Sequence, residues 1–304
     1  MLIDPRHLEQ ISIIVDAGTL QLAADRIGTS QPALSRMIRT LESRVGSPLF
    51  ERSRRPLRAT PLGLELANQG RAILVARKRA VELVDDGRKG SFGVLKIGAP
   101  PFLCERLVSE VIADFLASRP SIRIDLVPDY FPGLHQRLFQ NQIDIIVGPA
   151  KSADPTHSDI TLEPLFEDSN VIVGRAGHPL LAKDISIRDL NSVTWIGHSD
   201  RSMLRHDMET ALRLLGVRNL RFVFQSESAG AVIELVRRSD CLTVLPSFVV
   251  RAGRDNGLVT LPISLPTADQ TIAMVSLADR YEAKLIGDFK AHLRRHVVTH
   301  IASS

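Results

Sequence analysis

Residues 20–45 read LQLAADRIGTSQPALSRMIRTLESRV, a pattern typical of two helices joined by a tight turn. Apolar side chains recur at helical spacing up to Ile27, and Gly28 then interrupts the pattern, as a residue just past a helix end often does. Ser30 is placed to cap a second helix, and Pro32 fits the first turn of that helix, where a missing N–H costs little. The stretch therefore predicts a helix-turn-helix motif.

The second helix of this motif has two contrasting faces. One is an apolar stripe with steps of three or four residues, which predicts a side that packs on a core: Leu34, Ile38, Leu41 and Val45. The opposite face suits DNA, because an arginine can fork onto a guanine edge or a phosphate and a glutamine can pair with adenine. We predict that this helix binds DNA through Ser30, Gln31, Pro32, Ser35, Arg36 and Arg39. The alternative is an ordinary helical hairpin with a solvated polar face.

A basic segment, GSPLFERSRRPLRATPLG, covers residues 46–63. It holds four arginines within seven residues, and its prolines prevent a continuous helix: Arg52, Arg54, Arg55 and Arg58, with Pro48, Pro56 and Pro61. We expect Leu49 and Phe50 to pack into a small core shared with the two helices and with an earlier helix capped by Asp4. The arginines would then stand on a β-hairpin or an extended wing, where Arg52 and Arg54 contact DNA phosphates. A solubilising loop is the alternative.

A long helix is expected from Pro61 to about Gly87, with Thr60 as its cap. Its apolar residues alternate between steps of four and three, the seven-residue period of a coiled-coil seam: Leu62, Leu66, Ile73, Ala76, Ala80 and Leu83, with Gln69 in the remaining position. A single helix cannot bury such a seam, so we predict dimerisation through residues 61–90. A dimer would place two recognition helices on one duplex and predicts an operator of inverted half-sites.

Residues 23–63, AADRIGTSQPALSRMIRTLESRVGSPLFERSRRPLRATPLG, resemble the N-terminal domain of the LysR-type transcriptional regulators. The shared features are the Ala-Ala pair, Ser-Gln-Pro-Ala-Leu-Ser, the Ile…Leu-Glu run, Gly-x-Pro-Leu-Phe-x-Arg and Thr-Pro-x-Gly. The resemblance extends more weakly over the whole chain. It implies a winged helix-turn-helix domain in residues 1–60, a linker helix in 61–90 and an effector-binding domain in 91–304. It also implies a tetramer and contact with RNA polymerase.

Residues 85–93, DDGRKGSFG, are rich in glycine and charge and indicate the boundary before the second half of the chain. Beyond them short apolar runs alternate with helical patterns, which predicts parallel sheets covered by helices. The expected strands cover residues 94–97, 122–127, 144–148, 171–174, 194–197, 221–224, 242–245 and 271–275. The expected helices cover residues 104–117, 134–139, 203–215, 229–238 and 282–296.

These patterns predict an α/β multidomain chain that ends in two α/β subdomains, as in the periplasmic binding proteins, and the resemblance implies the same fold. Subdomain I would cover residues 91–165 and 268–304, and subdomain II residues 166–267. Ligands of such sheets bind beyond the carboxyl ends of the strands, so a pocket is expected between the subdomains. The turns at those ends predict an effector-binding set of Pro100, Pro101, Phe102, Tyr130, Phe131, Gly148, Ser199, Ser202, Ser226 and Ser228. For each serine a plain helix cap is the alternative.

The sequence leaves the chemistry of the effector open. Helix N-termini at these turns favour an anion, and Arg201 or Arg205 could supply positive charge. Relatives that bind small carboxylates often carry Ser or Thr in the turn after the first strand of this domain. Here that turn holds two prolines, which lack N–H donors, and a phenylalanine. An aromatic or amphipathic molecule, or a sugar, is therefore an alternative to a simple acid.

Composition narrows the remaining classes. The chain has 304 residues, 44% of them hydrophobic, and a mild net charge of +4. It holds no run of about 18 apolar residues, and its first ten residues, MLIDPRHLEQ, lack the apolar region of a signal peptide, so we expect a cytoplasmic protein without a membrane partner. Cys104 and Cys241 are expected to be reduced and buried, and a redox switch is the alternative.

No motif predicts catalysis. Phosphate-binding glycine loops, hydrolase elbows and zinc-type His/Cys spacings do not occur in the sequence. The neighbours His198, Ser199 and Asp200 cannot converge as a catalytic triad. We therefore expect no cofactor, no metal and no enzymatic activity. The function predicted is a DNA-binding transcriptional regulator controlled by a small molecule. The alternative is an intracellular solute-binding module, against which the basic N-terminal part counts.

Overall fold

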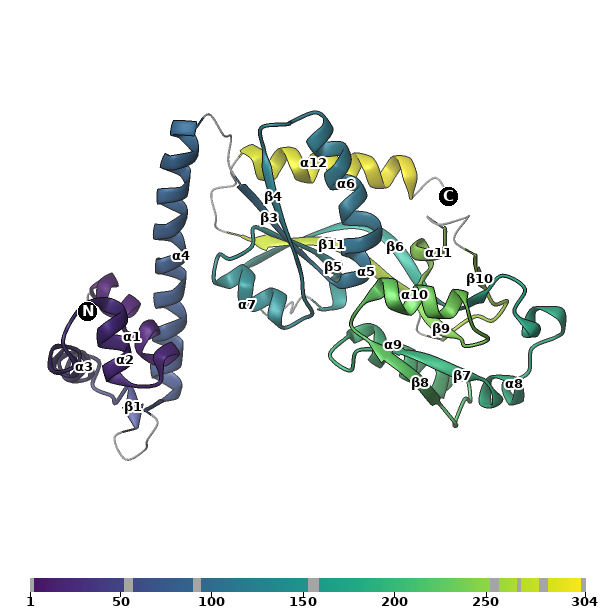
Figure 1. The fold of residues 1–304 in the computed structure, drawn as a ribbon, viewed down its shortest axis with the longest axis horizontal. Helices are drawn as coiled ribbons and strands as arrows, with labels where there is room; N and C mark the ends of the chain where they lie inside the picture. The colour runs from purple at the N-terminus through teal and green to yellow at the C-terminus, as the bar shows by residue number, and fades with distance from the viewer. Residues whose placement is uncertain are drawn as a thin grey trace. The chain divides into compact units, whose positions relative to one another are not determined.

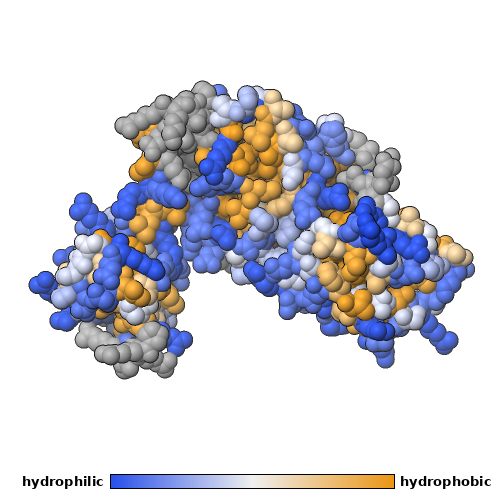
Figure 2. All heavy atoms as spheres, viewed as in Figure 1, coloured by the Kyte–Doolittle hydropathy of each residue, from blue (hydrophilic) through white to orange (hydrophobic). Residues whose placement is uncertain are grey.

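The computed structural model describes residues 3–51, 57–89, 94–152, 159–251, 257–266, 269–278 and 284–301. The chain divides into two compact units, one formed by Met1–Ser91 with Phe139–Gln142 and the other by Phe92–Leu138 with Ile143–Ser304. Figure 1 labels most of the helices and strands of both units. None of the described helices is long and apolar enough to cross a membrane. Figure 2 shows hydrophilic residues interspersed with hydrophobic patches on the face in view.

Three short helices open the first unit: α1 (Pro5–Ala17), α2 (Leu20–Ile27) and α3 (Gln31–Val45). The side chains of Asp4, Thr19 and Ser30 accept hydrogen bonds from backbone N–H groups of the first turns, at 2.9, 3.2 and 3.3 Å. Helices α1 and α2 end at Gly18 and Gly28, whose φ angles of 69° and 76° would strain any residue with a side chain. The predicted helix-turn-helix is confirmed, and local capping explains where each helix begins and ends.

The hairpin expected after α3 is present at its base. Strand β1 (Phe50–Glu51) pairs antiparallel with β2 (Arg58–Ala59). Glu42 fixes this base, because its carboxylate accepts hydrogen bonds from the backbone N–H groups of Leu49 at 2.8 Å and Phe50 at 3.4 Å. Both residues pack as predicted into a core whose buried members include Ile11, Ile14, Leu34 and Leu41. Arg52 and Arg54, which the sequence predicts to contact phosphates, lie outside the described residues.

Helix α4 (Pro61–Lys89) packs along α1, and Gly70 lies where the two helices meet. A Cβ atom added at Gly70 would lie 2.0 Å from the backbone oxygen of Leu8, so only glycine allows the two helices to come this close. An ion pair between Arg71 and Asp16, at 2.5 Å, joins the same two helices. The start of α4 is capped as predicted, since Thr60 Oγ1 accepts a hydrogen bond from the backbone N–H of Gly63 at 3.1 Å.

The predicted coiled-coil seam lies beside this packed side of α4. Leu62 is 37% exposed, and Gln69, Ala76 and Ala80 are also exposed. Leu66 and Ile73 are half-buried, and the side chain of Leu83 lies outside the described residues. Several seam residues therefore remain uncovered within one chain.

The second unit is built on a mixed seven-stranded sheet. Its strands are β3 (Val94–Ala99), β4 (Arg123–Pro128), β5 (Ile145–Pro149), β6 (Ile160–Arg175), β9 (Thr243–Pro246), β10 (Leu258–Thr260) and β11 (Asp269–Leu277). The order is β10-β6-β11-β5-β3-β4, with β9 also paired to β6. Strand β3 is parallel to β4 and β5, as predicted, whereas β11 runs antiparallel between β5 and β6. A separate parallel pair is formed by β7 (Thr194–His198) and β8 (Arg221–Ser226).

Helices flank these strands, as Figure 1 shows. They are α5 (Pro101–Leu103), α6 (Ser109–Ala117), α7 (Gly133–Phe139), α8 (Ile187–Ser192), α9 (Met203–Leu214), α10 (Ala229–Arg237), α11 (Ser247–Arg251) and α12 (Lys284–His300). A π-helical turn, η1 (Cys104–Val108), joins α5 to α6, and 3-10 turns cover Ala150–Ser152 and Pro179–Ala182. The predicted helix over residues 104–117 therefore begins three residues earlier and contains an irregular turn.

Strand β6 is much longer than the predicted strand over residues 171–174, and that boundary is wrong. Its first part carries Glu163, Glu167 and Asp168 and so shows no apolar run. It is held instead by pairing with β11, from Ile160 opposite Leu277 to Ser169 opposite Asp269. This partner comes from a hundred residues further along the chain, which no local pattern reveals.

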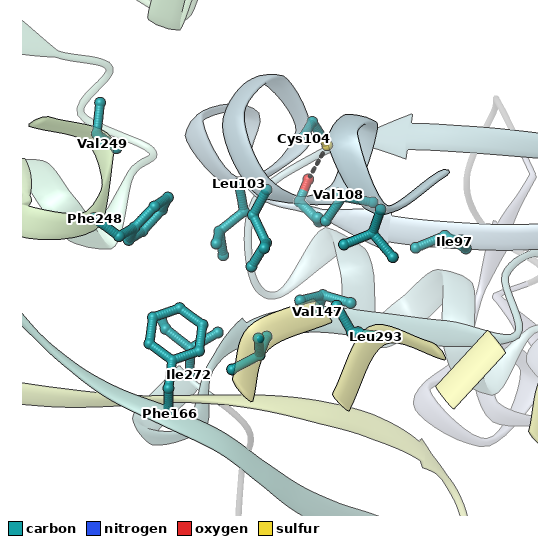
Figure 3. Packing of buried hydrophobic residues seen from close by; sticks show 14 of the residues in the cluster. Ile97, Leu103, Cys104, Val108, Val147, Phe166, Phe248, Val249, Ile272 and Leu293 are labelled. Carbon is teal, nitrogen blue, oxygen red and sulfur yellow. Dashed lines mark hydrogen bonds between the residues drawn. The ribbon is translucent and has the colours of Figure 1, made fainter. Parts of the chain in front are cut away.

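Strand β6 joins two halves of the unit. Its first part pairs with β11, and its last residues pair with β9 and β10. We refer to the elements around β3, β4 and β5 as subdomain I and to those around β7, β8 and β9 as subdomain II. Phe166 on β6 and Phe248 on α11 meet edge to face at 6.0 Å inside a core that both halves share (Figure 3). Trp195, fully buried, packs in the separate core of subdomain II, as expected.

Both cysteines are free thiols. Cys104 is buried, and its Sγ donates a hydrogen bond to the backbone oxygen of Ala99 at 3.2 Å (Figure 3). Burial, followed by the nearby charge of Glu105, raises the pKa of this thiol to about 12. Cys241 is half-buried. A thiol with so high a pKa holds almost no thiolate at neutral pH, which disfavours a redox role for Cys104.

Candidate functional site

The outer face of α3 carries the side chains predicted to bind DNA. Arg36 and Arg39 are exposed, as are Ser30 and Pro32, whereas Gln31 and Ser35 are half-buried. The opposite face holds buried Leu34, Ile38 and Leu41. The core stripe therefore fixes which side of α3 faces outward, because residues on opposite sides of a helix cannot both reach the core.

The two arginines of this face keep their positive charge available. Within the described ranges neither Arg36 nor Arg39 forms an ion pair with a carboxylate, and Arg39 Nη2 only donates to Ser35 Oγ at 3.3 Å. Ser30 is the N-cap of α3, and its side chain accepts a hydrogen bond from the backbone N–H of Ala33. Arg58 on β2 adds an exposed arginine at the base of the hairpin. This surface can accept phosphates or base edges without first breaking an internal ion pair.

A small cavity of about 60 Å³ lies between subdomains I and II, and we call it the inner chamber. Six of the predicted effector residues line it: Pro100, Pro101, Phe102, Tyr130, Phe131 and Ser202. Gly148 lies directly behind it, because a Cβ atom there would stand 3.1 Å from the Phe131 ring and 3.5 Å from Pro100. The structure therefore brings the predicted turns together at the carboxyl ends of β3, β4 and β5.

The other predicted serines take different positions. Ser199 is buried, and its Oγ donates to Glu227 at 3.2 Å. Ser226 Oγ accepts a hydrogen bond from the backbone N–H of Ser228 at 3.1 Å. Ser202 and Ser228 are the N-caps of α9 and α10, which is the structural alternative stated above for both. Of these four, only Ser202 lines the inner chamber.

Several lining residues of the inner chamber lie outside the turns predicted from the sequence: Ser152, Leu204, Asp207, Pro246, Phe248, Gln270 and Ile272, whereas Leu103, Pro149 and Met203 lie within those turns. Pro246 ends β9 and Phe248 lies two residues beyond it in α11, so the carboxyl-end rule applied to that strand as well predicts both. Met203, Leu204 and Asp207 lie in the first turns of α9, just past Ser202. Gln270 and Ile272 are brought to the chamber by β11, whose pairing no local pattern reveals. Leu103, Pro149 and Ser152 complete the lining.

A wider cavity of about 390 Å³ shares Pro101 and Tyr130 with the inner chamber, and we call it the outer mouth. Its charged lining residues are Glu105, Asp129, Arg201 and Glu227, and Ser228 also lines it. Arg201 spans the two subdomains, since its guanidinium lies 3.4 Å from Asp129 and 3.4 Å from Glu227. The same group stands 5.8 Å from the centre of the Tyr130 ring.

The protonation states at the mouth follow from these neighbours. Burial alone would raise the pKa of Asp129, but hydrogen bonds from Arg137 and from the Tyr130 backbone N–H, with the charges of both arginines, lower it overall. Burial, then the charge of Glu227, raises the pKa of Tyr130 to about 12. At neutral pH the mouth therefore presents an ionised Asp129 beside a neutral phenol.

His198 ends β7 behind Phe102 and is 1% exposed. Its Nε2 lies 2.7 Å from the backbone oxygen of Val244, and the Phe102 ring meets it edge-on at 5.1 Å. Burial lowers the pKa of this imidazole to about 4, although the hydrogen bond to Val244 opposes the shift. His198 is therefore neutral at physiological pH and joins subdomain II to the turn that carries Phe102.

A larger cavity, of about 630 Å³, lies among α6, α11 and α12 and shares Phe248 with the inner chamber. None of the predicted effector residues lines this larger cavity. Its lining includes charged and titratable side chains of both signs: Arg106, Glu110, Asp114, Arg251, His296 and His300. The described residues include no group of three or more His, Cys, Asp or Glu side chains placed to hold a metal ion.

Two protein families match the chain. Residues 5–64 match the bacterial regulatory helix-turn-helix protein of the lysR family, and residues 88–298 match the LysR substrate binding domain. The SDS degradation transcriptional activation protein of a Pseudomonas strain is 29% identical over 287 residues, which are 91% of each chain. The transcriptional activator protein LysR of Escherichia coli is 26% identical over 292 residues, 95% of this chain and 92% of the relative.

Solved structures share the fold along the whole chain. ArgP from Mycobacterium tuberculosis superposes with a TM-score of 0.70 at 16% identity and covers 97% of both chains. Full-length CbnR in complex with its target DNA superposes with a TM-score of 0.63 at 20% identity, over 96% of this chain and 99% of that one. These similarities extend over both units of the chain.

Proposed function

Because the chain belongs to the LysR family of bacterial transcriptional regulators, we propose that α3 reads an operator and that a small molecule between subdomains I and II controls DNA binding. The observation that carries this proposal is the outer face of α3. Arg36 and Arg39 are exposed there and, within the described ranges, form no ion pair with a carboxylate. The buried stripe behind them keeps this face outward.

The DNA-binding residues of the proposal are Ser30, Gln31, Pro32, Ser35, Arg36 and Arg39, with Arg52 and Arg54 of the wing on phosphates. Gln31 and Arg36 are candidates for base contacts, since amide and guanidinium groups pair with adenine and guanine edges in the major groove. Arg39 and the wing arginines would supply contacts to phosphates, which position the protein and make its affinity depend on salt.

The chain would bind its operator as a dimer formed through α4. The seam residues Leu62, Ala76 and Ala80 are exposed, and so are Val81 and Val84 further along the helix. Pairing two such helices would bury these side chains and set two copies of α3 on an inverted repeat. Assembly of dimers into a tetramer, contact with RNA polymerase and a cytoplasmic location belong to the same proposal.

The effector would occupy the inner chamber and the outer mouth. Both are lined from the two subdomains, so a molecule bound there contacts two parts joined by β6 and β11. A ligand that binds one relative arrangement of the subdomains better than another shifts the equilibrium toward it. The named relatives are regulators, and we propose no enzymatic activity for this chain.

DNase footprinting on DNA upstream of the protein's own gene tests the proposal. A dimeric regulator should protect two inverted half-sites whose centres are separated by whole helical turns. Arg36→Ala should weaken this protection. Arg188→Ala is the matched control, because it removes the same charge from an exposed position on α8, outside α3, and should leave the footprint unchanged. Absence of protection on any upstream fragment, with folded protein, would contradict the proposed role of α3.

A further inference from the structure

We infer that the molecule bound in the cleft carries a positive charge on an apolar or aromatic body, as a primary or quaternary ammonium compound does. The inference rests on the proposed function, because it concerns the effector of that same cleft. Three features support it: an inner chamber without a cation, a mouth rich in carboxylates, and an arginine that already stands where the ligand cation would bind.

The inner chamber is poorly suited to a carboxylate. Its walls are mostly apolar, with the rings of Phe102, Phe131 and Phe248 among them, and none of the described residues that line it is Arg, Lys or His. Its one charged residue is an acid, Asp207, which pairs with Lys151 at 2.7 Å. A carboxylate buried there would lose its hydration without gaining an ion pair to offset the cost. The apolar body of a ligand, in contrast, fits these walls.

The outer mouth has more acid than base. Glu105, Asp129 and Glu227 line it, and Arg201 is its one cationic lining residue among those described. Glu105 makes no ion pair within the described part of the chain. Arg137 also pairs with Asp129, at 3.0 Å, but does not line the cavity. The resulting field attracts a cation to the opening of an apolar chamber.

Arg201 shows how a ligand cation would be held. Its guanidinium lies between a carboxylate of subdomain I, Asp129, and one of subdomain II, Glu227, with the Tyr130 ring on a third side. Two carboxylates and an aromatic face are the groups that bind ammonium ions. Both ion-pair distances are 3.4 Å, longer than a strong charge-assisted hydrogen bond, and the side chain is 62% exposed. Arg201 is therefore held weakly enough for a ligand to displace it.

Helix N-termini do not reverse this preference. Helices α9 and α10 begin near the cleft, and their first turns would favour an anion. However, Ser202 Oγ already accepts the backbone N–H of Leu204 at 3.2 Å, and Ser228 Oγ accepts that of Ala231 at 3.2 Å. These two donors are used within the protein, and the carboxylates of the mouth carry full charges, whereas a helix N-terminus carries only a partial one. The side-chain charges therefore set the preferred sign of the ligand.

The charge of Arg201 gives a sharp test, because the two possible signs of ligand predict opposite effects. For a cationic ligand Arg201 is a competitor, and removing it frees both carboxylates and the Tyr130 ring. For an anionic ligand Arg201 is the available positive partner, and removing it weakens binding. The test variant is Arg201→Gln, and the matched control is Arg188→Gln, which removes an exposed arginine on α8 that lines neither cavity.

The experiment measures thermal stabilisation of the full-length protein by sets of three probes that share one body and differ in charge. For benzyl, phenethyl, indolyl-ethyl, cyclohexylmethyl and hexyl bodies, each set holds the ammonium, the alcohol and the carboxylate. We expect the ammonium member to stabilise most and the carboxylate least. Arg201→Gln should raise the affinity for the best ammonium probe by about tenfold, the effect of two weak ion pairs and a cation–π contact. Arg188→Gln should leave it unchanged.

Either of two results would overturn the inference: carboxylates that stabilise more than their ammonium partners, or weaker ammonium binding by Arg201→Gln than by the control. Failure of every ammonium probe to stabilise the protein would overturn it too. The same preparations are tested for binding to the operator fragment. Operator binding together with a carboxylate ligand would contradict only the sign of the effector, whereas loss of operator binding in the wild-type protein would contradict the proposed function.

Discussion

Lys151 Nζ lies 2.7 Å from Asp207 Oδ2, and this ion pair joins the turn after β5 in subdomain I to α9 in subdomain II. Asp207 lines the inner chamber, whereas Lys151 does not. Lys151 is 37% exposed and Asp207 17% exposed, so water screens the pair and its contribution to stability is small. Its position across the cleft gives it a larger influence on how often the two subdomains separate.

We therefore expect Asp207→Asn to lower the free energy of unfolding by less than about 1 kcal/mol while it speeds local opening. Hydrogen exchange of the backbone amides in the first turns of α9 should become measurably faster. The matched control is Asp288→Asn, which removes an acid paired at 3.7 Å with Arg119, away from the cleft. Equal exchange rates in α9 for the wild-type protein and Asp207→Asn would contradict the expectation that this ion pair limits local opening.

The contact between α1 and α4 predicts an unusual glycine effect. An alanine in the middle of a helix normally stabilises by up to about 1 kcal/mol relative to glycine. Gly70→Ala should instead destabilise the protein by about 1–3 kcal/mol, because its Cβ would lie 2.0 Å from the backbone oxygen of Leu8.

Urea denaturation of the variant and of Gly230→Ala tests this expectation. Gly230 lies in α10, and the nearest atom to a Cβ there is the flexible side-chain end of Glu105, at 3.4 Å. This control should be neutral or slightly stabilised. A stable Gly70→Ala variant would mean that the two helices are further apart than described.

The buried imidazole of His198 predicts a loss of stability in acid. Burial lowers its pKa from an ordinary value near 6.5 to about 4, so the folded protein favours the neutral form. As pH falls below 6.5, the unfolded chain takes up a proton that the folded protein excludes. The stability contributed by the neutral imidazole should therefore fall by about 2–3 kcal/mol between pH 7 and pH 4.5.

The measurement is urea denaturation at both pH values for the wild-type protein and for His198→Gln, whose amide can still donate to Val244. Titrating carboxylates affect both proteins alike, so the difference between them isolates the imidazole. The variant should lose about 2–3 kcal/mol less than the wild type between the two pH values. Parallel pH dependences would contradict the lowered pKa, because they would mean that the folded protein and the unfolded chain protonate His198 equally readily.

Local signals made the first unit predictable. Ser30 and Gly28 set the turn between α2 and α3 through their own backbone neighbours, and each was assigned from the sequence. The packing of Leu49 and Phe50 into the core was predicted because they are apolar residues in a segment whose prolines prevent a helix. By contrast, the packing of α4 on α1 through Gly70 depends on residues about 60 positions apart, and no local pattern indicates it.

The effector site shows the same division. Pro100, Phe102, Tyr130 and Phe131 were predicted because each follows a strand in a regular β-α pattern, and the structure brings them together. Gln270 was missed because β11 reaches the chamber by pairing with β5 and β6 over long sequence separations. The serines at helix starts were correctly placed near the strand ends, but capping uses Ser202 and Ser228, and a cap cannot be told from a ligand contact by sequence alone.

Binding of the operator by Arg36→Ala tests the central claim most directly. Fluorescence anisotropy of the full-length protein on a labelled footprinted fragment should show a loss of about 1–3 kcal/mol in specific affinity if Arg36 reads a base, with little change on unrelated DNA. Arg188→Ala is the charge-matched control and should bind like the wild-type protein. An unchanged operator affinity for Arg36→Ala would contradict the assignment of α3 as the helix that reads the operator.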